Sequence, residues 1–149
     1  MSVKLNGELV YLWRAVDHEG EILESYVTKT RDKAAALAFM KKALKRDGSP
    51  AAFVTGGLRS YKAAFPELGT GKKRETGRWA NNRVENSHLA FRRRKRAMQR
   101  FRQMKTLLKL ASAHANISNH FSAVGYLVNR RAYKLRRAAA LAEWQMLAA

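Results

Sequence analysis

Glu85 is the residue whose type and neighbours point most directly to chemistry in this sequence. It is the only acidic residue between Glu75 and Glu143, and the i+3 and i+7 spacing of a predicted helix places His88 and Arg92 on its face. A carboxylate in that setting can be a metal ligand. It can equally serve the helix alone, by favouring the helix dipole and pairing with Arg92. The residues by themselves leave both interpretations open.

A large excess of basic residues surrounds this glutamate. The 149 residues hold 30 Lys and Arg against 11 Asp and Glu, a net charge of +19, and residues 81–149 hold 15 of the basic side chains but only Glu85 and Glu143 as acids. Repulsion among so many positive charges destabilises a compact fold unless an anion offsets them, and nucleic acid is the commonest such partner. The alternative is a solvated helical surface. The cations expected to contact DNA phosphates are Arg92, Arg93, Arg94, Lys95, Arg96, Arg100, Arg102 and Lys105.

Composition argues against several other kinds of site. The chain has no cysteine and four scattered histidines, so a metal site built from thiolates or imidazoles is not expected. The opening MSVKLNGELVYLW is interrupted by polar residues and has the pattern of neither a signal peptide nor a membrane span. The glycine-rich loop at residues 69–77 lacks the ending of a nucleotide-binding P-loop. We therefore expect a soluble intracellular protein.

The start of the chain has the alternation that is typical of strands. Aromatic and β-branched residues predict strands at residues 9–17 and 21–29, with a short strand before Glu8. The chain therefore opens with a three-stranded antiparallel meander. Asp32 is the expected N-cap of a helix that ends at Gly48.

A fourth strand at residues 51–55 follows that helix and ends on Gly56 and Gly57. Strand ends of this kind often carry a catalytic carboxylate, because the backbone is rigid there and the side chain points into a crevice. The two glycines can form a phosphate-binding turn, form a structural turn, or stand in place of a lost carboxylate. The local pattern does not separate these alternatives.

The rest of the chain is mostly helical by its periodicity. One helix stops at Pro66, and a basic loop follows, with one weak strand expected at residues 75–79. Three further helices are expected at residues 83–98, about 104–115 and 130–147. The last of them is expected to pack through Tyr133, Leu141 and Trp144. Trp13 is likewise expected in the core, and Trp79 is a candidate for lining the site.

The order of these elements is that of a ribonuclease H-like fold: a three-stranded meander, a crossover helix, a fourth strand and an acid on a later helix. In such a fold, carboxylates from the first strand, the end of the fourth strand and the late helix hold two divalent metal ions about 4 Å apart for phosphoryl transfer. Oxygen ligands suit Mg²⁺, which is a hard cation. The expected fold class is therefore α/β, ribonuclease H-like, with a mixed sheet whose first strand is truncated and with C-terminal helices.

Four segments resemble one known family. They are YLWRAVDHEGEILE, VTGGLRSYKAAFPELG, RWANNRVENSHLAFRRRKRAMQRFRQMKTL and RRAAALAEWQ, and they are similar to the catalytic domain of bacterial insertion-sequence DDE transposases, specifically insertion-sequence family six. The resemblance covers essentially the whole chain. It implies one DDE transposase/integrase-like catalytic domain at residues 1–149, with a ribonuclease H-like core at about residues 1–97 and a helical extension at about 98–149. It also implies Mg²⁺ or Mn²⁺ as the cofactor and insertion-sequence ends as the DNA partner.

Carried over residue by residue, the family's late-helix glutamate matches Glu85. The family's second aspartate belongs directly after the VT of the fourth strand, where this chain has Gly56. Its first aspartate precedes the VKLNGE segment by about four residues and would fall at or just before Met1. Asp17 is no replacement, because it is expected in a hairpin loop at the far end of the second strand. Mg²⁺ keeps its hydration shell unless several ligands compensate, so we expect Glu85 to be a residual ligand only.

The resemblance therefore predicts a truncated DDE transposase that is catalytically inactive but binds DNA. The DNA-binding helix-turn-helix that lies upstream of the catalytic domain in this family is expected to be missing as well. The expected partners are DNA and either further copies of the chain or a full-length transposase, at the nucleoid of a bacterial cytoplasm, with no membrane and no small-molecule substrate. Two alternatives stay open: a non-catalytic DNA-binding or transposase-interacting regulator, and a non-functional remnant of an insertion sequence.

Overall fold

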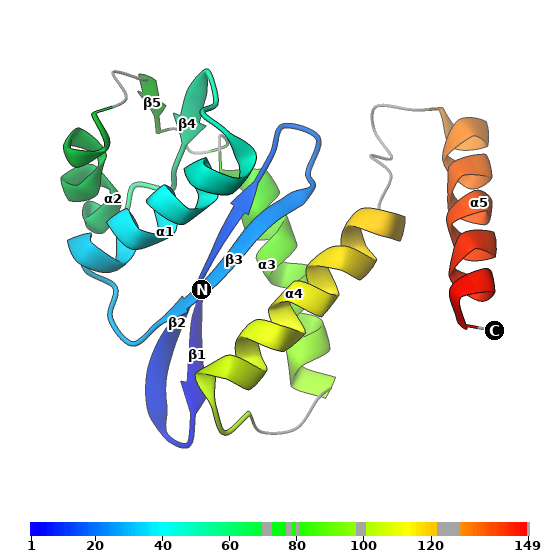
Figure 1. Cartoon of the computed structure of the whole chain (residues 1–149), viewed down its shortest axis with the longest axis horizontal. Helices are drawn as coiled ribbons and strands as arrows, with labels where there is room; N and C mark the ends of the chain where they lie inside the picture. The colour runs from blue at the N-terminus through cyan, green and yellow to red at the C-terminus, as the bar shows by residue number, and fades with distance from the viewer. Residues whose placement is uncertain (70–72, 77–78, 80, 98–100, 122–128, 149) are drawn as a thin grey trace.

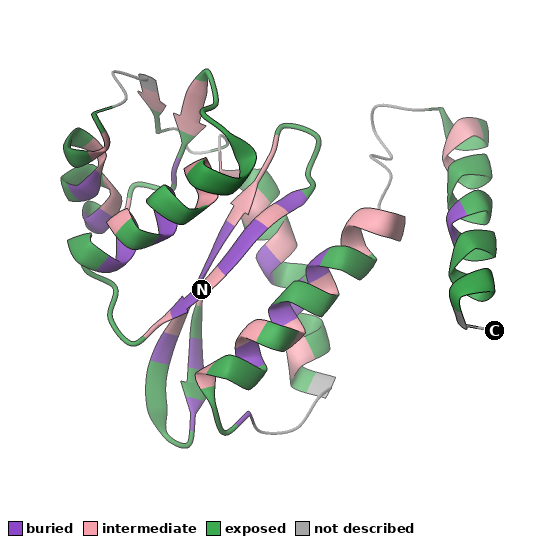
Figure 2. Ribbon diagram, in the orientation of Figure 1, coloured by how far each residue is buried: buried purple, intermediate pink, exposed green. Residues whose placement is uncertain are grey.

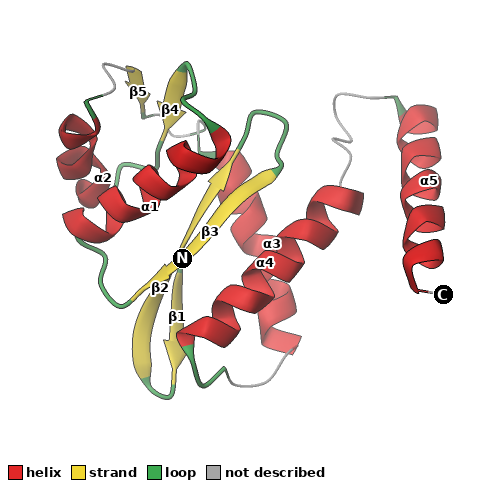
Figure 3. Ribbon diagram, viewed as in Figure 1, coloured by secondary structure: helices red, strands yellow, loops and turns green. Residues whose placement is uncertain are grey.

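The fold is a mixed α/β arrangement in which helices cover both faces of a small sheet (Figure 1). The computed structural model describes residues 1–69, 73–76, 79, 81–97, 101–121 and 129–148. All the strands lie in the first half of the chain, where helices are interspersed among them, and the second half is helical (Figure 3). The α/β class that the sequence predicts is therefore confirmed.

The chain opens with a three-stranded antiparallel meander, as the alternation of the sequence predicts. Its strands are β1 (Ser2–Leu5), β2 (Glu8–Val16) and β3 (Ile22–Thr28), in the order β1-β2-β3. The two residues between β1 and β2 both have positive φ, 48° at Asn6 and 88° at Gly7. An Asn-Gly pair adopts this backbone at low cost, and the turn fixes the register of β1 on β2.

The crossover from the meander is the helix α1 (Lys33–Asp47), and both of its ends are capped as expected. Oδ1 of Asp32 accepts a hydrogen bond from the backbone N–H of Ala35 at 2.8 Å, and Gly48 ends the helix with φ 79°. These caps satisfy backbone groups that a helix end otherwise leaves unpaired.

The fourth strand forms a second, separate sheet, so the prediction of a single mixed sheet is wrong for the described residues. β4 (Ala52–Val54) pairs in parallel with β5 (Lys73–Glu75), and in the described part of the chain neither strand joins the meander by a ladder. Between them lie α2 (Arg59–Ala64) and the 3₁₀ helix η1 (Phe65–Leu68). The weak strand thus begins earlier than the predicted 75–79. The basic loop has no apolar alternation to set its register, so pairing with β4 decides it.

Two apolar clusters lie on opposite faces of β2. On one face, Val10 and Leu12 pack with Phe91 of α3 (Asn82–Ala97) and with Leu107 of α4 (Met104–Phe121). On the other face, Trp13 packs against α1 and α2 and is 5% exposed, which confirms its prediction as a core residue. Figure 2 shows buried stretches on the three strands and on α1, α3 and α4. Alternate residues of one strand therefore serve two cores.

The last helix, α5 (Arg130–Ala148), contacts the body only near the end of α4 in the part of the chain that is described (Figure 1). The ring of Trp144 lies 5.8 Å from that of Phe121. Leu141 and Trp144 remain 49% and 43% exposed, so the prediction that they are buried anchors is wrong. One turn of α4 offers too little surface to cover them. None of the helices described is long and apolar enough to cross a membrane.

Candidate functional site

A cavity of about 820 Å³ lies where the meander, α1, β4 and the start of α3 meet. Its wall includes Glu85 and Gly56, the two positions that the sequence singles out for a carboxylate, together with Asn81, Arg14 and Met1. The meander, the end of β4 and the start of α3 are distant in sequence, and together they bring these residues to one cavity.

Glu85 and position 56 lie on either side of one amide group. Nδ2 of Asn81 donates a hydrogen bond to Oε1 of Glu85 at 3.3 Å. The same nitrogen lies 2.9 Å from the point that a Cβ atom would occupy on Gly56. A side chain at position 56 would therefore have to displace this amide, and it would then stand next to the Glu85 carboxylate.

The start of β1 reaches the same place. The amino group of Met1 donates to the carbonyl oxygen of Leu12 at 2.8 Å. Burial lowers the pKa of this amino group to about 6, Arg31 lowers it next, and Glu85 acts in the opposite direction. Met1 is thus within electrostatic range of Glu85. The three positions to which the resemblance carries the family's carboxylates lie around one cavity.

His88 points inward rather than toward the opening of the cavity. It is 7% exposed, and within the described chain its Nδ1 has no hydrogen-bond partner. Burial lowers its pKa to about 3, and the positive charges of the amino terminus and of Arg14 lower it further. The imidazole is therefore neutral at physiological pH, although it shares a face of α3 with Glu85 and Arg92 as the spacing predicts.

Arg14 belongs to this site but was missed by the sequence reasoning. It is 3% exposed, its Nη1 donates to the carbonyl oxygen of Ser87 at 2.9 Å, and its guanidinium lies 4.9 Å from the ring centre of Phe91. Burial lowers its pKa to about 10, so it remains charged. A signal was present in the sequence: Arg14 follows Leu12 by two residues in a strand, and alternation places both on the same buried face.

The described residues do not fit a pair of divalent metal ions. Glu85 supplies one carboxylate, Gly56 supplies none, and among the residues described no three His, Cys, Asp or Glu side chains come together as ligands. Asp17 also lines the cavity, but its Oδ1 accepts hydrogen bonds from the backbone N–H groups of Glu19 and Glu21 in its own hairpin loop. The carboxylate of Asp17 thus holds its loop, as its position in the sequence indicates.

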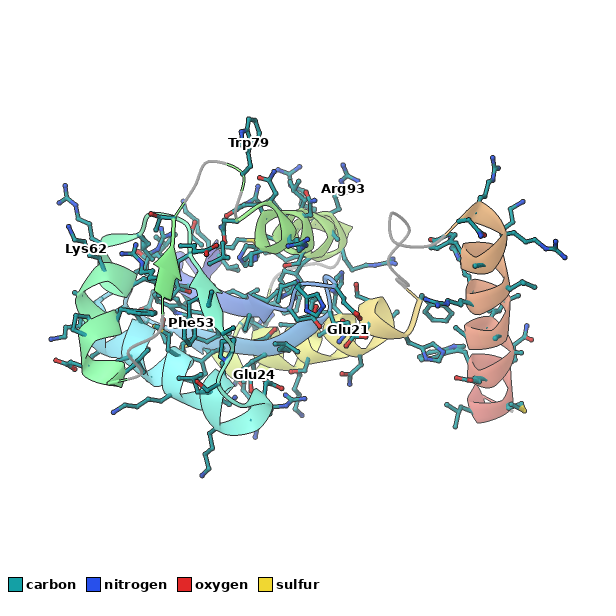
Figure 4. All side chains as sticks on the ribbon, turned by 90° about the horizontal axis from the view of Figure 1, so that it is seen from above. Glu21, Glu24, Phe53, Lys62, Trp79 and Arg93 are labelled. Carbon is teal, nitrogen blue, oxygen red and sulfur yellow. The ribbon has the colours of Figure 1, made fainter. Side chains whose placement is uncertain are left out.

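The basic residues of α3 form an outward surface next to the cavity. Figure 4 shows Arg93 pointing away from the body. Lys95 is half-buried, and Arg100 lies outside the described residues. The exposed cations of the predicted set are Arg92, Arg93, Arg94, Arg96, Arg102 and Lys105. We call these six residues the basic surface; the first four lie on α3, Arg102 precedes α4 and Lys105 lies in α4. Trp79, a further candidate for the site, is 72% exposed and does not line the cavity.

Comparison with known proteins gives a consistent result. Residues 1–123 match the model of a family described as a DDE domain. The chain is 32% identical over 112 residues to the transposase for insertion sequence-like element IS431mec of Staphylococcus aureus (strain N315), which covers 72% of this chain and 50% of the relative. The transposase for insertion sequence element IS257 in transposon Tn4003 of Staphylococcus aureus matches with the same identity and coverage. The chain spans about half the length of these curated relatives. No solved structure gives a significant match.

Proposed function

The chain belongs to the DDE transposases of insertion-sequence family six, and from this premise we propose that it acts in DNA transposition by binding DNA without cleaving or joining it. The observation that carries the proposal is the make-up of α3. This 16-residue helix presents Glu85 to the cavity at its first turns and four cations of the basic surface, Arg92, Arg93, Arg94 and Arg96, along the rest of its length. One helix therefore links the remnant of a reaction centre to a surface suited to phosphates.

Three features support a ribonuclease H-like assignment of the fold. The element order is the one expected, the crossover helix α1 covers one face of the meander, and the carboxylate positions surround one cavity. For the domain organisation we propose a single domain in which α4 belongs to the body, because Leu107 is fully buried against the meander and the family match runs to residue 123. The separable extension is then α5.

The proposed lack of DNA cleavage follows from the carboxylates. Transposases of this family use divalent metal ions, and a two-metal reaction needs ligands that hold both ions on the attacking and leaving oxygens. Gly56 stands where the family's second aspartate belongs, so the cavity has Glu85 without that partner carboxylate. A single carboxylate does not replace the hydration shell of Mg²⁺, so we expect these 149 residues neither to cleave nor to join DNA.

DNA binding is proposed to reside in the basic surface, and the partner is the end sequence of an insertion element. Lysine and arginine side chains that neutralise phosphates release counterions, so affinity falls as salt rises. If six cations contact phosphates, the slope of log K against log salt is about −5. A flat salt dependence would remove the basis for this proposal. Such a protein would work at the nucleoid of a bacterial cytoplasm.

Cleavage is tested separately, with terminal-repeat DNA incubated with the chain and either Mg²⁺ or Mn²⁺. We expect no nicking and no strand transfer. Glu85→Gln is the matched control, because it keeps the shape of the side chain and removes its charge. Metal-dependent nicking by the native chain that disappears in Glu85→Gln would show that the chain is an active nuclease and that this proposal is wrong.

A second candidate function is regulation through mixed oligomers with a full-length transposase or with further copies of the chain. The observation in its favour is the exposure of three large apolar side chains of α5: Leu135, Met146 and Leu147 are 65%, 74% and 84% exposed. Size-exclusion chromatography with light scattering separates the candidates. A monomer that binds DNA favours the first, and a stable oligomer that becomes monomeric in Leu135→Gln favours the second.

A further inference from the structure

The guanidinium of Arg14 is a buried charge that is only partly satisfied. Nη1 donates to the carbonyl oxygen of Ser87, but Nε and Nη2 are also buried and, in the part of the chain described, have no hydrogen-bond partner. Burying a charge with unpaired donors is costly, so buried guanidinium groups are normally paired with an anion. The packing around Arg14 therefore lacks an anionic partner.

The groups already near Arg14 do not supply this partner. The amino group of Met1 and the side chain of Arg92 are positive, and His88 is neutral. Glu85 accepts a hydrogen bond from Asn81 through Oε1, and within the described chain it makes none with Nε or Nη2 of Arg14. The partner must reach Arg14 from another direction.

The register of the meander shows which direction remains. Ser2 pairs with Tyr11, and Met1 pairs with Leu12 by two backbone hydrogen bonds of 2.8 Å. Because β1 and β2 are antiparallel, each residue toward the amino terminus on β1 pairs with a residue one position later on β2. The position two residues ahead of Met1 is therefore directly opposite Arg14.

Alternation along the strands fixes the face of that position. Val3 and Met1 on β1, like Leu12 on β2, pack toward α3 and α4. A residue two positions ahead of Met1 has the same parity, so its side chain faces α3 together with Arg14. A residue directly ahead of Met1 would face the opposite side, toward Trp13 and α1.

We propose that Arg14 is a positioning residue whose two unpaired N–H groups receive a carboxylate, presented by an extended strand two residues ahead of Met1 in the register of β1. A guanidinium offers parallel donors at the spacing of the two carboxylate oxygens. This inference rests on the proposed function, because the position two residues ahead of Met1 is the one to which the family's first aspartate maps. Arg14 then orients that carboxylate toward the side of the cavity that holds Glu85.

The test adds three residues to the amino terminus of the 149-residue chain and measures thermal unfolding without DNA or metal. The extension Met-Asp-Ser puts the aspartate opposite Arg14, and Met-Ser-Asp puts it on the other face with the same composition. Each is compared with its asparagine counterpart, Met-Asn-Ser or Met-Ser-Asn. We expect Met-Asp-Ser to raise the unfolding midpoint by about 5 °C over Met-Asn-Ser, and we expect no difference in the second pair.

Substitution of Arg14 tests whether the stabilising effect of the added aspartate depends on the guanidinium. In Arg14→Met the advantage of Met-Asp-Ser over Met-Asn-Ser should vanish, and in Arg14→Lys it should be partly retained, because an ammonium group keeps the charge but not the fork. An equal gain from both aspartate extensions, or no gain from Met-Asp-Ser, would overturn the inference even where Arg14→Met fails to fold. The unfolding experiment does not involve DNA. A flat salt dependence of DNA binding would therefore refute the proposed function without affecting the pairing of Arg14 with the added aspartate. Failure of that pairing would likewise leave the proposed DNA binding untouched.

Discussion

The basic surface makes a prediction that can be worked out before the experiment. The perturbation is the triple replacement of Arg93, Arg94 and Arg96 by Gln, which removes three exposed cations from one helix. Each phosphate contact contributes about −0.9 to the slope of log K against log salt. The native slope of about −5 should therefore fall to about −2.5. Between about 50 and 200 mM salt, the native chain should lose about 1,000-fold in affinity and the triple variant about 30-fold.

The assay is fluorescence anisotropy of a labelled duplex that carries an insertion-sequence end, titrated at a series of salt concentrations. The control variant replaces Lys41, Lys45 and Lys62 by Gln, which removes the same charge from α1 and α2 on the other face of the meander. Figure 4 shows Lys62 far from Arg93. We expect the control to keep the native slope. If both variants lower the slope equally, net charge alone attracts DNA, and the assignment of binding to α3 is refuted.

Further predictions concern the site and the core. Gly56→Asp should leave the chain unable to nick supercoiled plasmid with Mn²⁺, because it restores one carboxylate only; nicking that depends on Glu85 would contradict this. Phe91→Ala should lower the free energy of unfolding in urea by about 3–5 kcal/mol, since its side chain is fully buried, whereas Leu89→Ala at a site 45% exposed should change it by about 0.5 kcal/mol or less. Burial lowers the pKa of His88 to about 3. As the pH falls below about 6.5, this imidazole is protonated in the unfolded chain but not in the folded one, so the free energy of unfolding decreases. Urea titrations should show a loss of about 1 kcal/mol per pH unit in the native chain and a smaller loss in His88→Gln.

The elements that the sequence predicts well are those whose signals are local. Asn6 and Gly7 supply the backbone of a tight turn, and Asp32 supplies a cap, so the meander and α1 follow from a few neighbouring residues. β5 is different, because a polar stretch with no apolar alternation becomes a strand only by pairing with β4. Trp144 failed as a predicted core residue for a related reason: its burial depends on how much surface a distant element offers.

The site divides in the same way. Glu85 and Gly56 emerge from the resemblance, and the tertiary structure brings them together across Asn81. The burial of Arg14 could have been inferred from alternation with Leu12, but its missing partner could not, because that depends on which groups of α3 and β1 surround it. A sequence pattern gives the face of a residue, and the unsatisfied hydrogen bonds on that face require coordinates.

The side chain of Asn119 makes two hydrogen bonds to the backbone of Ile22, with Ile22 N–H donating to Oδ1 at 2.9 Å and Nδ2 donating to the Ile22 carbonyl at 3.1 Å. These partners are 97 residues apart, so the helix that seals the meander is made long after the strands themselves. At a synthesis rate of about 5–20 residues per second, roughly 5–20 seconds pass between the synthesis of Ile22 and that of Asn119, so the part of the meander that α4 covers stays exposed for that interval. Folding of this protein on the ribosome is therefore limited by the arrival of α4, and that interval is when a chaperone would find the most surface to hold.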